Sequence, residues 1–134
     1  MKRKIATPLA AIALAFGAFT LMSALPADKV MTKEGGVYIV NTTELGKNVK
    51  GYKGTTPLKI HIKDGKVLKI ESLKNMETPK YWARIKQELL DSWNGKTVKQ
   101  AEKLEVDALT GATLSSNAVK ENVKLGLEYY KRNK

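Results

Sequence analysis

The segment that most constrains the fold is an alternating stretch, PLKIHIKDGKVLKIESL, which starts at Pro57. Apolar residues occupy every second position before Asp64-Gly65, and apolar residues return after it. A period of two places successive side chains on opposite faces of a strand. An Asp-Gly pair between two such runs is a strong turn signal. The sequence therefore predicts a β-hairpin with one buried face and one solvated face.

The register of this hairpin depends on the length of its loop. A two-residue loop, Asp64-Gly65, would place Ile60 opposite Lys69 and so mix apolar and charged side chains on one face. A three-residue loop, residues 63–65, places Ile60 opposite Leu68 instead. It also puts the glycine at the left-handed position of a type I turn with a bulge. We therefore predict the three-residue loop.

A helix is predicted to follow, with Thr78 as its N-cap and Pro79 at its first position. Asn94-Gly95 ends this helix. Its apolar stripe comprises Trp82, Ile85, Leu89 and Leu90. We expect Trp82 and the neighbouring Tyr81 to pack in the core rather than against a ligand. A second, short helix is predicted within residues 97–104.

The last helix is predicted to begin at a serine, either Ser115 or Ser116, whose hydroxyl would cap its first turn. Four apolar residues then recur at helical spacing, namely Val119, Val123, Leu127 and Tyr130. We expect this apolar face to pack against the sheet.

The order of these elements indicates the fold class. Strands and helices do not alternate strictly, which favours an α+β fold with a small, mostly antiparallel sheet and helices packed on it. Residues 37–40 are a further strand candidate. Residues 28–36 are polar and are predicted to be a linker. The predicted domain therefore spans residues 37–134.

The N-terminus carries a separate signal. Residues 2–4 are basic, and the 21 residues of 5–25 carry no charge. A basic start before an apolar run is the form of a secretory signal. Twenty-one residues at a rise of about 1.5 Å can also cross a bilayer core of roughly 30 Å. We predict a signal peptide or an N-terminal membrane anchor at residues 1–27, with the remainder outside the cytoplasm because the basic residues stay inside.

The charge balance bears on the class of partner. The chain has 24 Lys and Arg against 13 Asp and Glu, and a net +8 remains without the three N-terminal cations. Such an excess can indicate nucleic acid, but the predicted export argues against it, and the lysines are scattered rather than clustered with aromatic residues. We expect no nucleic-acid partner. A basic surface outside the cytoplasm suits an anionic membrane surface or an acidic redox partner.

Cysteine and histidine usage restricts the chemistry further. There is no cysteine, and the single histidine, His61, falls on the predicted solvent face of the hairpin. We therefore expect neither disulfides nor a metal centre built from thiolates or imidazoles. The sequence also shows no general acid/base pair and no nucleophile beside a base, so we assign no catalytic residue. A free-standing enzyme is disfavoured.

The stretch DALTGATLSSNAV, residues 107–119, is small and rich in hydroxyls just before the last helix. Its simplest interpretation is a turn followed by a helix cap. The alternative follows from electrostatics, because a helix N-terminus presents free N–H groups and about half a positive charge, which suits a phosphate. Gly111 and Ala112 leave room beside the backbone, and Thr113 and Ser115 supply hydroxyls. The residues alone leave both interpretations open.

Residues 110–115, TGATLS, with Asp107 three residues earlier, resemble the covalent flavinylation motif of the FMN-binding domain family. This family includes flavoprotein subunits of sodium-pumping NADH:quinone and of ferredoxin:NAD oxidoreductase complexes, and small exported flavoproteins. Two further stretches resemble the family, GYKG at residues 51–54 and ETP at residues 77–79. Together the three stretches cover residues 51–119 in the family's order.

The resemblance implies FMN as the cofactor, attached through a phosphoester to Ser115 by a separate Mg-dependent flavin transferase. Ser115 stands where the family usually has Thr, and Lys80 stands where a glycine commonly follows the ETP stretch. The residues implied for the cofactor site are Ser115, Thr113, Ala112, Gly111, Thr110, Thr78 and Glu77. The implied function is that of an extracytoplasmic electron-transfer protein. The alternative is a sensory or binding module at the cell surface that holds FMN loosely or not at all.

Overall fold

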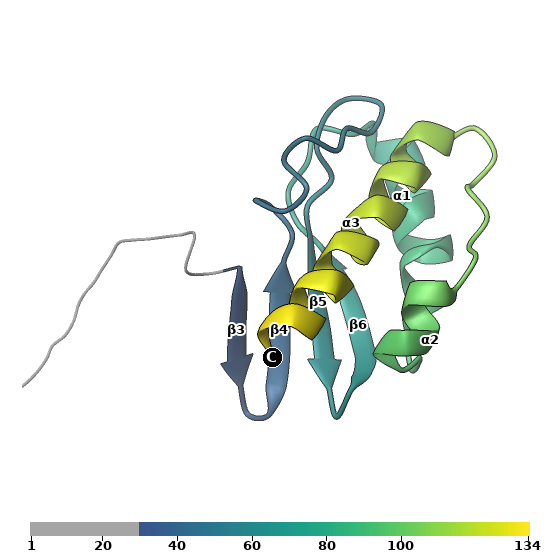
Figure 1. The fold of residues 1–134 in the computed structure, drawn as a ribbon. Helices are drawn as coiled ribbons and strands as arrows, with labels where there is room; N and C mark the ends of the chain where they lie inside the picture. The colour runs from purple at the N-terminus through teal and green to yellow at the C-terminus, as the bar shows by residue number, and fades with distance from the viewer. Residues whose placement is uncertain (1–29) are drawn as a thin grey trace, which may run out of the picture.

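The computed structural model describes residues 30–134, which form one antiparallel sheet with helices packed against it (Figure 1). The strands, in order across the sheet, are β3 (Met31–Glu34), β4 (Val37–Asn41), β5 (Leu58–Lys63) and β6 (Lys66–Ser72). The helical elements are α1 (Pro79–Glu88), the 3₁₀ helix η4 (Leu90–Trp93), α2 (Val98–Lys103) and α3 (Thr113–Asn133). The predicted α+β class is confirmed. The predicted signal or anchor segment, residues 1–27, lies outside the described residues.

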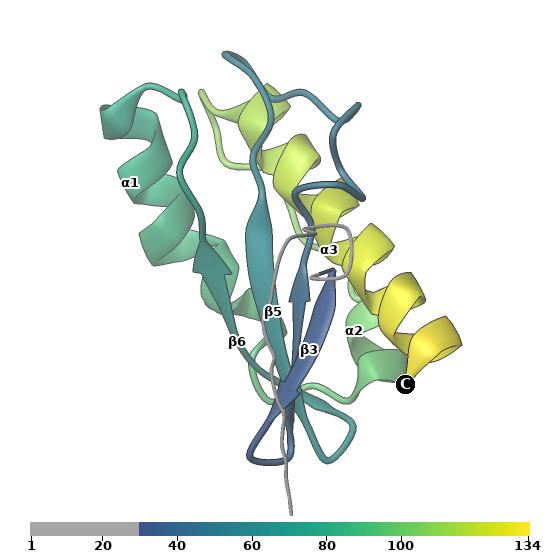
Figure 2. The same cartoon turned by 90° about the vertical axis from the view of Figure 1, so that its left-hand side faces the viewer.

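Helix α3 crosses one face of the sheet, as Figures 1 and 2 both show. The four residues of its predicted apolar stripe are all buried there. The closest approach is at Gly126, where a Cβ atom would lie 2.5 Å from Cδ1 of Ile60 on β5. Glycine is therefore required for the helix to lie this close to the strand. None of the helices between residues 30 and 134 combines the length and the apolar character that a membrane span requires.

The register of the β5–β6 hairpin differs from the prediction. The loop has two residues, because Lys63 pairs with Lys66 and both Asp64 and Gly65 have positive φ, at 53° and 75°. The register shifts between His61 and Ile62, since His61 pairs with Lys69 while Ile62 pairs with Val67. Leu68 is the extra residue of this bulge, and its side chain is 47% exposed.

The bulge removes the conflict that had argued against a two-residue loop. Ile60 faces Ile70 rather than Lys69. Val67 and Ile70, three residues apart, are therefore both buried on the side of α3, which a regular strand with a period of two does not allow. The three-residue loop predicted from the sequence was wrong because it placed the irregularity in the turn instead of in the strand.

The sheet also begins earlier than predicted. Residues 28–36 were predicted to be a linker, but β3 lies within them and pairs antiparallel with β4 along its whole length. The turn between them is Gly35-Gly36, with φ of 58° and 83°. A two-residue glycine turn with positive φ is a common hairpin connection, so the linker prediction was wrong for this segment.

The helix boundaries are partly as predicted. Thr78 is the N-cap of α1 with Pro79 following, although the Thr78 hydroxyl makes no capping hydrogen bond. The short helix α2 starts with a complete capping box between Thr97 and Gln100. Helix α3 begins at Thr113 with Ala112 as N-cap, so the prediction of a serine cap was wrong. Both serines lie inside the first turn of α3, where they can serve another purpose.

Candidate functional site

A half-open pocket of about 360 Å³ lies where the N-terminus of α3 meets the start of α1 and the loop before β5. This end of the molecule is opposite the β-hairpin turns (Figure 1). The residues that line the pocket are Tyr52, Glu77, Thr78, Tyr81, Gly111, Ala112, Thr113, Leu114 and Ser115. Three segments far apart in the sequence therefore converge on a single cavity.

The N-terminus of α3 faces this pocket without a side-chain cap. Its N-cap residue is Ala112, whose methyl group cannot accept a hydrogen bond, and no other side chain caps the helix. The preceding Gly111 has φ of 82°, a left-handed conformation that disfavours any other residue. The first-turn amides, together with the positive end of the helix dipole, are thus left for a ligand.

The loop before α3 is fixed from two sides. Nη1 of Arg84, on α1, donates a hydrogen bond of 2.7 Å to the carbonyl of Thr110. The Ser116 hydroxyl, fully buried, accepts a 3.1 Å hydrogen bond from the amide of Leu109. Both contacts hold the loop against the helical layer. They define the direction in which the α3 amides point.

Ser115 is the third residue of α3 and lines the pocket, although the residue is only 5% exposed. Its hydroxyl donates to Oε1 of Glu77, which comes from the segment before α1. The two residues are 38 positions apart in the sequence. The structure therefore brings two of the predicted site residues, Ser115 and Glu77, into direct hydrogen-bond contact.

Glu77 is the centre of this hydrogen-bond cluster. Its side chain is buried, and besides Ser115 it accepts from the amides of Tyr52, at 3.2 Å, and Lys53, at 2.6 Å. Its own amide donates to Oδ1 of Asn75 at 2.9 Å. A buried carboxylate is tolerated when several donors satisfy it. Here the carboxylate links three chain segments around the pocket.

Gly51 explains why the loop of residues 51–54 can lie so close to Glu77 and Ser115. A Cβ atom on this residue would lie 3.0 Å from Oε1 of Glu77 and 3.2 Å from Cα of Ser115. The loop closes through a 2.7 Å hydrogen bond from the Gly51 amide to the Gly54 carbonyl. Gly51 therefore lets the two following amides reach the carboxylate, which leaves the Tyr52 side chain at the pocket wall.

The apolar part of the pocket comes from Tyr52, Tyr81 and Leu114, which are 66%, 40% and 58% exposed. Trp82 is in the core as expected, and its Nε1 donates a 2.9 Å hydrogen bond to the Ser72 hydroxyl. The expectation that Tyr81 also packs in the core was wrong. At the start of α1, adjacent positions point in different directions, so only one of the two aromatic rings can face inward.

The structure brings six of the seven predicted site residues to the pocket wall; Thr110 lies behind it, bonded to Arg84. Asp107 is exposed and does not line the pocket. Sequence reasoning missed Tyr52, Tyr81 and Leu114. The two glycines that flank Tyr52 were a signal for the first of these. Residues 30–134 contain no cluster of three or more acidic or histidine side chains that could hold a metal ion.

Comparison with known families bears on the choice between a simple helix cap and a cofactor site. A model of the FMN-binding domain family matches residues 51–128, more than half of the chain. The chain belongs to this family. A search among curated proteins finds no match to this chain. The matched region begins at the loop that contains Gly51 and runs into the second half of α3.

FMN is the cofactor that this family membership indicates, and the pocket has the groups that FMN requires. The uncapped amides of α3 and the hydroxyls of Thr113 and Ser115 suit the phosphate. The aromatic and aliphatic side chains at the mouth suit the isoalloxazine ring. The cavity is at the small end of the usual range for ligand pockets, about 300–1,000 Å³. A pocket of this size and openness would leave part of the cofactor accessible.

Proposed function

We propose that this protein is an extracytoplasmic electron-transfer flavoprotein whose FMN is linked by a phosphoester to the hydroxyl of Ser115. The observation that carries the proposal is the position of Ser115, which lines the pocket in the first turn of α3, where the helix amides are uncapped. An ester there would place the phosphate at the positive end of the helix dipole. FMN supplies one- and two-electron chemistry, and the protein supplies its position and surroundings.

The proposed attachment is made by a separate flavin transferase, as the family resemblance implies, and residues 30–134 contain no cluster of three or more acidic or histidine side chains that could hold a metal ion for the transfer. The protein's own contribution is to present the acceptor hydroxyl. Glu77 holds this hydroxyl by accepting its hydrogen bond. Gly111 and Ala112 supply a wall without bulky side chains beside it. A transferase would thus meet a serine of fixed orientation at the bottom of an open pocket.

The proposed location rests on the sequence of the N-terminus, with its basic residues 2–4 and uncharged residues 5–25. A covalent cofactor suits this location, since a flavin that dissociates outside the cell is lost by dilution. The location is tested by fractionating cells that express the full chain and by treating spheroplasts with protease. Protection of the domain in spheroplasts but not in lysed cells would contradict the proposal.

The attachment is tested by measuring the intact mass of the full chain, co-expressed with a flavin transferase, under denaturing conditions. We expect an increment of one FMN less water for the wild type and for Ser115→Thr, and no increment for Ser115→Ala. Thr113→Ala is the matched control, because Thr113 also lines the pocket but is expected to keep the increment.

The outcomes separate the possible functions. Loss of the increment in Thr113→Ala alone would move the acceptor to Thr113. Yellow colour that is lost on denaturation would mean that FMN is held without an ester. An unmodified, colourless protein would favour a sensory or binding module that works without flavin.

A further inference from the structure

Large apolar side chains are unevenly distributed over the surface of residues 30–134. Five are exposed; Tyr52, Tyr81 and Leu114 line the pocket, and Met76 directly precedes the pocket residue Glu77 in the sequence. Single exposed apolar residues are normal on a soluble protein, whereas a gathered group marks an interaction site. The fifth, Leu68, lies on the bulge of β6 near the hairpin turn.

A bound cofactor would not account for this whole group. Tyr52, Tyr81 and Leu114 line the pocket, but Met76 does not, and it is the most exposed of the four at 75%. Met76 directly precedes Glu77, whose carboxylate is fixed in the cluster described above, so its place at the edge of the site is set by the backbone. The apolar surface therefore extends beyond the cavity.

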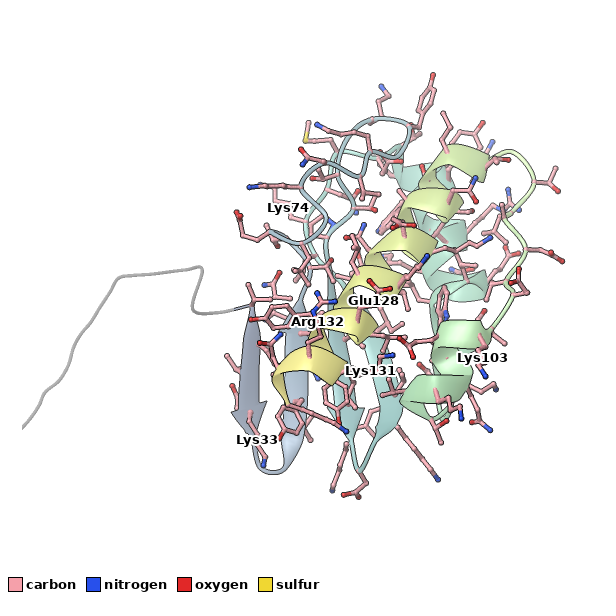
Figure 3. The ribbon with its side chains drawn as sticks, viewed as in Figure 1. Lys33, Lys74, Lys103, Glu128, Lys131 and Arg132 are labelled. Carbon is pink, nitrogen blue, oxygen red and sulfur yellow. The ribbon has the colours of Figure 1, made fainter. Side chains whose placement is uncertain are left out.

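The exposed charges next to these apolar residues in the sequence have one sign. Exposed Lys53, Lys74 and Lys80 alternate with the apolar residues along the chain, and the Lys53 ammonium lies 5.8 Å from the centre of the Tyr52 ring. Residues 50–57, 73–83 and 110–118 contain one carboxylate only, that of Glu77, which is buried. In Figure 3, Lys74 lies by the loops above the strands, whereas Lys33 lies at the turn end.

We propose that this pocket rim, formed by Tyr52, Met76, Tyr81 and Leu114 with Lys53, Lys74 and Lys80, is the docking surface for a redox protein with a carboxylate-rich rim of its own. The proposal rests on the proposed electron-transfer function and specifies the partner's chemistry. An apolar centre within a charged edge is the usual anatomy of a protein interface. Transient electron-transfer encounters bury less than about 1,200 Å², which a surface of this extent can supply.

A protein is a better occupant than a lipid surface because of where the rim lies. Lys53 and Lys80 adjoin in the sequence the pocket residues Tyr52 and Tyr81, and Lys74 lines a neighbouring cavity that shares Glu77 with the cofactor pocket, so a partner attracted by these cations would arrive near the flavin. A single-sign field around an opening raises the rate of encounter by 10- to 1,000-fold with oppositely charged partners, and salt weakens it. With FMN bound, the docked partner would be oxidised by one electron and the flavin reduced by one, with no group transferred between the two proteins.

The test measures the rate at which a reduced plant-type ferredoxin, used as an acidic one-electron probe, reduces the flavinylated full chain. Its potential of about −400 mV favours transfer to most flavins. Lys53, Lys74 and Lys80 are changed together to Glu. The matched control changes Lys63, Lys66 and Lys69 to Glu, since these exposed lysines lie at the hairpin, away from the pocket, and the change in net charge is the same.

We expect the rim variant to react at least about tenfold more slowly at low salt and to lose most of its salt dependence. The hairpin variant should stay within about twofold of the wild type. For the apolar part, Met76→Gln should slow the reaction, whereas the matched exposed change Leu68→Gln should not. Equal slowing in the rim and hairpin variants would mean that only net charge matters, and unchanged rates in both would also overturn the proposal.

Two further measurements identify the reason for a failure. Binding to vesicles of phosphatidylcholine and phosphatidylglycerol, lost only in the rim variant while the ferredoxin rate is unchanged, would make the rim a lipid surface and refute the protein partner. Dithionite reduction of the visible flavin band reports the cofactor independently of docking. A wild type with no flavin band would refute the proposed function itself, whereas a reducible flavin with no rim effect would refute the docking proposal alone.

Discussion

Replacing Glu77 with Ala should destabilise the protein before any flavin is attached, because this carboxylate accepts hydrogen bonds from three donors on two other chain segments. Its donors are the amides of Tyr52 and Lys53 and the hydroxyl of Ser115. A hydrogen bond to a charged group contributes about 1.5–3 kcal/mol. Both loop residues are exposed, so water can replace the acceptor for two donors, and only the Ser115 hydroxyl is left buried. We expect a loss of about 2–4 kcal/mol in the free energy of unfolding.

The measurement is urea unfolding of the flavin-free full chain, followed by circular dichroism. At a slope of about 1.5 kcal/mol per molar urea, the expected loss moves the midpoint down by roughly 1.3–2.7 M. Glu77→Gln should lose about half as much, because its carbonyl oxygen still accepts from two donors while its amide group meets the third donor. The control is Glu88→Ala at the end of α1, where an exposed carboxylate lies 3.5 Å from Arg84 and removal should cost less than about 0.5 kcal/mol.

The reasoning would be refuted if Glu77→Ala unfolded at the same urea concentration as the wild type. The carboxylate would then not hold the loop that contains Tyr52. Equal losses for Glu77→Ala and Glu88→Ala would also refute it, since burial and the three donors are what distinguish the first residue from the second.

Two further predictions concern the fold. Gly126→Ala places a Cβ atom 2.5 Å from Cδ1 of Ile60 and 3.2 Å from Cγ2 of Thr42. The resulting overpacking should cost about 1–3 kcal/mol, which should exceed the gain of about 1 kcal/mol in helix propensity. The variant should therefore melt at a lower temperature than the wild type. Burial raises the pKa of Tyr130. Tyr38 raises this pKa further by a smaller amount, whereas Lys33 lowers it. The folded state then holds this proton more tightly than the unfolded state, so stability should fall as pH rises above about 10. In melts across pH 9–11, Tyr130→Phe should show a smaller fall than the wild type.

The parts of the fold that the sequence predicted are those set by local periodicity. The inward side chains of β5 and the apolar stripe of α3 follow patterns of two and 3.6 residues, and both are buried as expected. The bulge at Leu68 could not be found in this way, because an extra residue breaks the period. The sequence does contain a sign of this bulge, because Val67 and Ile70 are apolar and three positions apart, and both are buried in the structure.

The candidate site, by contrast, depends on a contact between distant residues that the sequence did not predict. Its separate motifs were visible in the sequence, but the contact between Glu77 and Ser115 was not, because 38 residues separate them and no local pattern relates them. A glutamate before a helix is normally exposed, and burial costs free energy unless donors are supplied. The donors come from a third segment, whose Gly51 permits the approach. Only the packing of α1, α3 and the loop together makes the buried carboxylate stable.

The openness of the pocket bears on the proposed ester. A ligand held without a covalent bond usually has 70–90% of its surface buried. A half-open cavity of about 360 Å³, with Tyr52 and Leu114 more than half exposed at its mouth, is poorly suited to enclosing FMN to that extent. A phosphoester at Ser115 would remove the need for enclosure, because retention would no longer depend on buried area. The flavin edge could then stay open to the docking surface, which is what an electron carrier requires and what a tightly closed noncovalent site would prevent.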